Sequence, residues 1–102
     1  MLENMIKTNH MLDHKILLFL LEPGQIDPEI RGLIANKFMA KYQRPCCLLT
    51  RTNNNGKETY EGSMRGYTKT GILSFKNILE QCPGVIYVEG HDNAAGVGIK
   101  AD

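Results

Sequence analysis

The fold follows from residues 15–21, KILLFLL, a nearly unbroken apolar run that is followed by the turn pair Pro23-Gly24. The run has the length of a strand, and a strand without polar alternation is typical of a parallel sheet buried on both faces. Asp27 and Pro28 come next, and they suit the cap and the first position of a helix. This stretch therefore predicts a strand, a helix and a second strand that returns beside the first.

The helix expected after Asp27 carries an apolar stripe and ends at Pro45, which cannot continue it. Its stripe, spaced as on one helical face, comprises Ile30, Leu33, Ile34, Phe38 and Tyr42. Residues 46–50, CCLLT, then predict the second strand. Residues 1–14 are expected to be a leader or linker, with at most a short helix.

Downstream, the sequence predicts a hairpin, a short helix and two more strands. Residues 53–56, NNNG, favour a tight turn because Asn and Gly tolerate positive φ. The strand over 59–65 should alternate, with Tyr60, Gly62 and Met64 on one face and Glu61, Ser63 and Arg65 on the other.

Residues 68–71 are expected to form a loop. A helix capped by Ser74 should run to Gln81 and bury Phe75, Ile78 and Leu79. A strand over 85–88, a connection over 89–93 and a last strand to about Lys100 complete the order. We therefore expect one α/β domain over residues 15–102, with a mixed β-sheet of about five strands and two main helices in the order β-α-β-β-α-β-β.

The bulk properties describe an ordinary globular chain. Its 102 residues suffice for one domain, and no apolar run approaches the roughly 18 residues of a membrane span. The three cysteines form no CxxC pair, so we expect reduced, buried or half-buried thiols in a cytoplasmic protein and no zinc site. Cys46 and Cys47 should point to opposite faces of their strand.

Charge is unevenly spread although the net charge is only +1. Residues 31–76 hold nine Lys or Arg and two Asp or Glu, whereas the rest of the chain holds three basic and nine acidic residues. A basic middle on a near-neutral chain indicates either an anionic partner or ordinary surface scatter.

Two short segments carry the candidate chemistry. In residues 89–96, EGHDNAAG, Gly90 permits close backbone approach, His91 can donate to a phosphate or stack on a base, and the small residues leave room for a ligand or a neighbouring strand. Upstream, Ser63 and Arg65 share a face and suit a phosphodiester oxygen. Taken alone, a histidine between Gly and Asp is more often a plain loop residue than a ligand contact, and the arginine is equally consistent with an exposed edge-strand residue.

Taken together and in order, four motifs resemble those of the DHH-associated domain of RecJ-like single-stranded-DNA exonucleases, members of the DHH phosphoesterase family. They are Gly32-Leu33-Ile34-Ala35-Asn36-Lys37, Tyr42-Gln43-Arg44-Pro45, Gly62-Ser63-Met64-Arg65-Gly66 and Glu89-Gly90-His91-Asp92-Asn93-Ala94-Ala95-Gly96. Three positions depart from the family pattern, where Glu89 replaces a Gly, Gly66 replaces a Ser and Glu29 replaces a Gly.

The resemblance implies a domain that binds single-stranded DNA in a cytoplasmic nuclease of DNA repair and recombination. The substrate-binding residues it implies are Ser63, Arg65, Gly90, His91, Asn93, Ala94, Ala95 and Gly96. In this family two divalent ions, typically Mn²⁺ or else Mg²⁺, are held by a separate catalytic DHH domain. The chain has no Asp-His-His motif, since Asp13-His14 runs into Lys15, so we expect no catalytic or metal-ligating residue and no cofactor here, and no nuclease activity from the chain alone.

Two other readings stay open at this point. The substrate could instead be a short oligonucleotide or a cyclic dinucleotide, as in DHH-family oligoribonucleases and cyclic-dinucleotide phosphodiesterases. The chain could also be a free-standing module that binds nucleotides without cleaving them.

Overall fold

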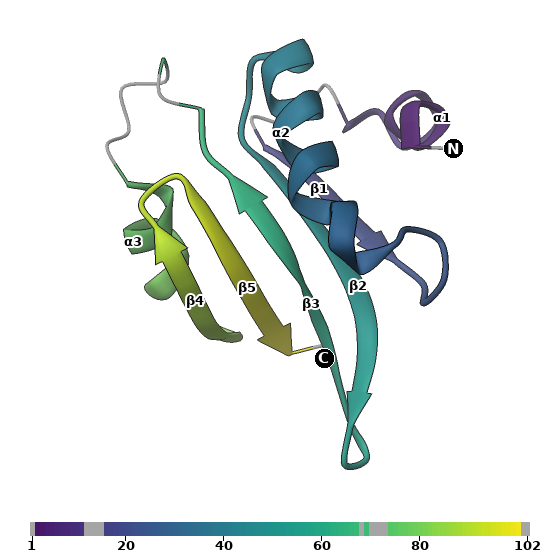
Figure 1. Ribbon diagram of the computed structural model, residues 1–102, viewed down its shortest axis with the longest axis vertical. Helices are drawn as coiled ribbons and strands as arrows, with labels where there is room; N and C mark the ends of the chain where they lie inside the picture. The colour runs from purple at the N-terminus through teal and green to yellow at the C-terminus, as the bar shows by residue number, and fades with distance from the viewer. Residues whose placement is uncertain (1, 12–15, 68, 70–73, 101–102) are drawn as a thin grey trace.

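A computed structural model of the chain describes residues 2–11, 16–67, 69 and 74–100. They form a five-stranded mixed sheet, in the order β1-β2-β3-β5-β4, with helices packed on both faces (Figure 1). The strands are β1 (Leu17–Leu21), β2 (Cys46–Asn54), β3 (Lys57–Arg65), β4 (Val85–His91) and β5 (Ala94–Lys100). The helices are α1 (Leu2–Thr8), the 3-10 turn η2 (Pro28–Ile30), α2 (Arg31–Tyr42) and α3 (Phe75–Glu80). The predicted α/β class and the order of the five strands and two main helices are confirmed.

Strands β1 and β2 pair in parallel and every other pairing in the sheet is antiparallel. Parallel neighbours need a crossover, and η2 and α2 supply it. The Asp27 side chain accepts a hydrogen bond of 2.9 Å from the Glu29 N–H, which caps the entry as predicted. The helix ends where Gln43 takes the left-handed conformation, φ 54°, two residues before Pro45.

The buried side of α2 differs from the predicted stripe. Ala35 and Phe38 are buried, but Leu33 is 72% exposed and Ile30 is 43% exposed. At about 100° per residue, Leu33 stands about 200° from Ala35 and therefore faces away from the sheet. Ile30 belongs to the tighter 3-10 turn, whose different angular step takes it out of the α2 register.

Burial of β1 on both faces was also a wrong expectation. Leu17, Phe19 and Leu21 are buried under α1 and α2, whereas Leu18 and Leu20 remain 48% and 45% exposed. The reason is topological, because β1 is an edge strand and α3 packs on the other face against residues of β2 to β5 instead. The apolar run therefore reflects a half-buried strand with an uncovered apolar side.

The two faces of the sheet build two cores. Cys46 joins the core under α1 and α2, and Cys47 joins the core under α3, so the adjacent cysteines do point to opposite faces. Burial raises the pKa of each thiol to about 12. The third cysteine, Cys82, is free and exposed, contrary to the expected burial.

The N-terminal segment is more than a leader where the structure describes it. Helix α1 contributes Leu2 and Ile6 to the core beneath α2. Glu3 at its start also pairs with Lys41 of α2, at 3.1 Å between Oε1 and Nζ. The later residues of the expected leader, 12–14, lie outside the described residues.

The β2–β3 hairpin and the alternation of β3 form as predicted. Asn55 and Gly56 both have positive φ, 54° and 84°, which matches the twist of a two-residue hairpin turn. The Gly56 N–H also donates to Asn53 Oδ1 at 2.9 Å. The loop expected over residues 68–71 falls, apart from Lys69, outside the described residues.

The segment after it contains two corrections. Ser74 caps α3 as expected, but the helix has only six residues, and it turns Phe75 and Leu79 to the core while Ile78 stays 41% exposed. Strand β4 continues through His91, whereas residues 89–93 were expected to be a connection. Pairing of His91 with Ala94 extends the ladder to a tight turn at Asp92 and Asn93. None of the helices in the described ranges is long and apolar enough to cross a membrane.

Candidate nucleic-acid interface

Beside α2, the strands β3, β5 and β4 present a part of the sheet that no helix covers in Figure 1. Their register aligns three rows of residues across it. The rows are Arg65–Ala94–His91, Ser63–Gly96–Glu89 and Glu61–Gly98–Tyr87. Directly opposite residues in antiparallel strands share a face, so these nine residues form one surface on the α2 side, which we call the polar face.

Arg65 occupies one end of the polar face and packs against α2. A Cβ atom at Gly32, in the first turn of α2, would overlap the Arg65 guanidinium and would lie 3.8 Å from Ser63 Oγ. Arg65 Nη1 donates to the Met64 carbonyl at 2.8 Å, and the side chain is half-buried. Gly32 thus makes the space that holds the guanidinium beside the Ser63 hydroxyl.

His91 lies in the same row as Arg65, with Ala94 between them. Two strand spacings separate the Arg65 and His91 backbones by about 10 Å, and the His91 side chain is exposed. Gly90, just before it, has φ 139°, and a Cβ there would lie 2.7 Å from the Ala94 carbonyl oxygen. Alternation placed Ser63 and Arg65 together correctly, and the ladder brings His91 to the same face.

The other predicted site residues divide between this face and the interior. Ala94 and Gly96 lie on the polar face and keep its floor flat. Ala95 points the other way into the core under α3. Asn93 joins the segment after β3 to the start of α3, since its backbone oxygen accepts from the Gly66 N–H at 2.9 Å and its Oδ1 accepts from the Phe75 N–H at 3.4 Å.

The β4–β5 turn is fastened to α3 by further bonds. Ser74 Oγ donates to Asp92 Oδ1, and the Lys76 N–H donates to the Asp92 backbone oxygen, both at 2.9 Å. Lys76 Nζ reaches the Gly90 carbonyl at 3.4 Å, which brings an ammonium group to the turn that carries His91. Arg65 therefore supplies the positive charge at this end of the polar face, and Lys76 approaches the same turn from α3.

The opposite end of the polar face is acidic and was missed from the sequence. Tyr87 Oη donates to Glu61 Oε1 at 3.0 Å, and Thr52 Oγ1 donates to Glu61 Oε2 at 2.8 Å. Burial and the bond to Glu61 raise the pKa of Tyr87. A Cβ atom at Gly98 would overlap the Tyr87 ring, so this glycine leaves the space that the ring occupies over β5. Extending β4 to His91 would have revealed it, since 87, 89 and 91 alternate onto one face.

A hollow of about 920 Å³ opens at this acidic end, between the β1–η2 connection and the row of Glu61 and Tyr87. Arg31 and Thr50 help to line it, and Arg31 Nη1 donates to the Glu61 backbone oxygen at 2.8 Å. The Arg31 Nε and the Thr50 hydroxyl are buried without a hydrogen-bond partner among the described residues. Such unpartnered polar atoms are rare in native proteins, and a water molecule or a ligand usually satisfies them.

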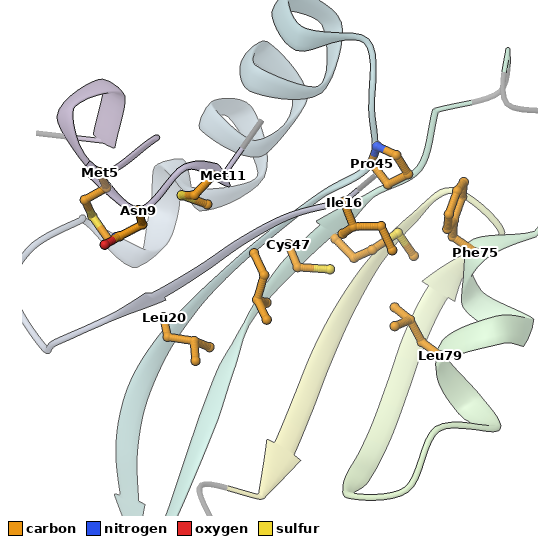
Figure 2. Close-up of a pocket in the computed structure, with 11 residues that line it drawn as sticks. Met5, Asn9, Met11, Ile16, Leu20, Pro45, Cys47, Phe75 and Leu79 are labelled. Carbon is orange, nitrogen blue, oxygen red and sulfur yellow. The ribbon is translucent and has the colours of Figure 1, made fainter. Parts of the chain in front are cut away.

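A second hollow, of about 770 Å³, lies on the other face of the sheet (Figure 2). Met5 and Met11 form one side, Phe75 and Leu79 of α3 form the other, and β1 contributes the exposed Leu20. Asn9 is its only polar lining residue among those described, and no cation reaches it. Because no Lys or Arg is among its described lining residues, it suits a phosphate less well than the polar face, which is the better candidate for a nucleic acid.

The described residues do not provide a metal centre. No group of three or more His, Cys, Asp or Glu side chains in these ranges is arranged to hold a metal ion.

Comparison with known proteins gives one consistent relationship. Over 99 residues, 97% of the chain, the sequence is 36% identical to YorK of Bacillus subtilis strain 168, provisionally named as an SPbeta prophage-derived single-strand DNA-specific exonuclease. The same values hold for yorK of Bacillus phage SPbeta, provisionally named as a single-strand DNA-specific exonuclease. The chain spans 17% of the length of each relative, so it is similar to one part of a much larger protein. No protein-family profile and no solved structure matches the chain.

Proposed function

We propose that this chain is the strand-binding, DHH-associated domain of a RecJ-like single-stranded-DNA exonuclease. In this proposal it holds DNA on the polar face for a metal-dependent catalytic DHH domain that is not among the 102 residues. The observation that carries the proposal is the row Arg65–Ala94–His91, with Ser63 in the neighbouring row. The names of the two relatives, which cover nearly the whole chain, support the substrate.

The chemistry of the row suits a phosphodiester. The guanidinium of Arg65 is held by Met64 and Gly32 and keeps donors for a phosphate oxygen, with which it makes the stronger, charge-assisted class of hydrogen bond. The side chains of Ser63 and His91 make no hydrogen bond with the described residues, so each is available as a further donor. Ala94 and Gly96 between them allow the backbone of a strand to lie close to the sheet. Phosphate contacts of this kind position a strand without reading its sequence.

The departures from the family pattern fit this arrangement only in part. Gly66 is buried against Asn93 and Phe75, so a serine there would displace one of them. Glu89 stands one row from Arg65 and repels a phosphate placed over that row. We infer that phosphates occupy the Arg65 row and avoid the Glu89 row.

The test is a titration of the chain with a fluorescently labelled single-stranded oligonucleotide, read by anisotropy at low and moderate salt. We expect weak binding that falls as salt rises, with a slope of about −0.7 for each phosphate neutralised. Unlabelled single-stranded DNA should compete better than duplex DNA or a cyclic dinucleotide. Superior competition by the cyclic dinucleotide would replace DNA with that substrate class, and no binding even at low salt would remove the proposal.

A further inference from the structure

The polar face has opposite charges at its two ends. Arg65 and His91 occupy one row, with Lys76 nearby, while Glu61 and Glu89 occupy the two rows beyond. Alternate residues on one face of a strand are about 7 Å apart, so the three rows span about 14 Å. A nucleotide that lies across these rows meets the Arg65 guanidinium at one end and the Tyr87 ring with the Glu61 and Glu89 carboxylates at the other, where Arg31 also lines the hollow. The two exposed or half-buried carboxylates disfavour a phosphate at that end, so the phosphate is expected at Arg65 and the base at Tyr87.

We propose that the acidic end of the polar face is a nucleobase subsite that prefers cytosine to thymine. It rests on the proposed function, since the phosphate of the same nucleotide is held at the Arg65 row. The Tyr87 ring provides the stacking surface, and the Glu89 carboxylate accepts a hydrogen bond from the amino group of the base. The hollow next to Tyr87 gives the space for one base.

Tyr87 is built as a platform. Its ring lies over Gly98, where any side chain would displace it, and its hydroxyl is fixed by Glu61 at 3.0 Å. Glu61 is itself held by Thr52, which fixes the acceptor, so the tyrosine cannot turn away without losing its bond to Glu61. The ring is only partly buried, which leaves area for a base. Stacking of a base on an aromatic ring is a main source of affinity for single strands.

Glu89 supplies the selectivity. Its carboxylate is exposed in the row between Tyr87 and His91 and makes no hydrogen bond or ion pair with the described residues. An ionised carboxylate only accepts hydrogen bonds. Cytosine offers an amino group where thymine offers a carbonyl oxygen, so Glu89 attracts the first and repels the second. The two pyrimidines have similar size, which leaves this group as the main difference.

The floor of the hollow indicates that a polar ligand belongs there. Thr50 is 7% exposed, and its buried hydroxyl has no hydrogen-bond partner among the described residues. The Nε atom of Arg31 is likewise buried and without a hydrogen-bond partner among them. Both residues line the hollow beside Glu61. A base, or a water molecule that it traps, gives these atoms partners that the protein itself does not supply.

The experiment compares short homopolymers of deoxycytidine and deoxythymidine, equal in length, in anisotropy titrations of the chain. We expect tighter binding of the cytosine homopolymer by about tenfold, the scale of one hydrogen bond to a charged group. Glu89→Gln should abolish most of this preference, whereas Glu80→Gln, which removes an exposed carboxylate from α3, should keep it. Tyr87→Leu should weaken binding of both homopolymers about 5- to 150-fold, and Tyr87→Phe, which keeps the ring, should weaken it much less.

The outcomes separate this inference from the function on which it rests. If Arg65→Ala weakens binding but Glu89→Gln leaves the cytosine preference unchanged, the subsite is wrong and the strand-binding function stands. Equal affinity of the unaltered chain for both homopolymers would also show that the subsite is wrong, and it would leave the strand-binding function standing. If Arg65→Ala leaves binding unchanged, the proposed function is wrong, and the subsite, which depends on it, is wrong as well. Thermal melting of each variant, followed by circular dichroism, confirms that the protein compared is folded.

Discussion

Substitution of Arg65 by alanine tests the centre of the polar face most directly. One N–H of the Arg65 guanidinium donates to the Met64 carbonyl at 2.8 Å, which leaves the other N–H groups of the guanidinium for a phosphate. A hydrogen bond to a charged group contributes about 1.5–3 kcal/mol. Because Arg65 is only half-buried and solvent screens the contact, the lower end applies, and Arg65→Ala should weaken single-stranded DNA binding about tenfold.

Salt dependence and a matched variant make the result specific. Loss of one phosphate contact should reduce the slope of log affinity against log salt by about 0.7. Lys57→Ala is the control, since Lys57 is an exposed cation on the same strand, eight residues and about 27 Å from Arg65. We expect it to change affinity less than about twofold, the range of a surface charge far from the ligand. Arg65→Lys should recover only part of the affinity, because an ammonium cannot reproduce the planar fork.

The measurement is the same anisotropy titration, paired with a thermal melt of each variant. The lost bond to Met64 should lower the free energy of unfolding by no more than about 1.5 kcal/mol, so the variant stays folded at the assay temperature. The reasoning is refuted if Lys57→Ala weakens binding as much as Arg65→Ala, since binding would then depend on total charge and not on the row. An unchanged affinity for Arg65→Ala would refute it equally.

Three further outcomes are expected. Gly90→Val should lower the free energy of unfolding by about 1–3 kcal/mol, because a β-branched residue resists φ 139° and its Cβ would lie 2.7 Å from the Ala94 oxygen. Gly24→Ala is the control: Gly24 has φ 87° and no atom within 4 Å of an added Cβ, so this change should lower the free energy of unfolding less in the same melting assay. A thiol reagent at neutral pH should label Cys82 in the folded chain and should label Cys46 and Cys47 only on unfolding. Because the pKa of about 12 of these two buried thiols in the folded chain lies above the unfolded value of 9.0, the free energy of unfolding should decline as pH rises from about 9. A thermal midpoint that stays constant up to pH 11 would contradict this pH dependence. The isolated chain with Mn²⁺ or Mg²⁺ should not degrade labelled single-stranded DNA, and metal-dependent degradation that copurifies with the chain would overturn this expectation.

Local sequence determined the elements because each depends on neighbouring residues. Asp27 and Pro28 favour a helix start through their own side chains, and Asn55-Gly56 accepts the positive φ of a two-residue turn. The period of two in β3 put Ser63 and Arg65 on one face without any knowledge of the fold. Helix starts, tight turns and strand alternation depend on residues only a few positions apart, so predictions based on them held in the structure.

What lies across the sheet could not be read from the sequence. The exposure of Leu18 and Leu20 depends on where α3 packs, and α3 comes more than fifty residues later in the chain. The pairing of Tyr87 with Glu61, and the space that Gly32 leaves for Arg65, depend equally on strand order and on the docking of α2. Local propensity located the strands and put Ser63 and Arg65 on one face, but only the antiparallel register, set by long-range hydrogen bonds, decided which side chains stand in one row.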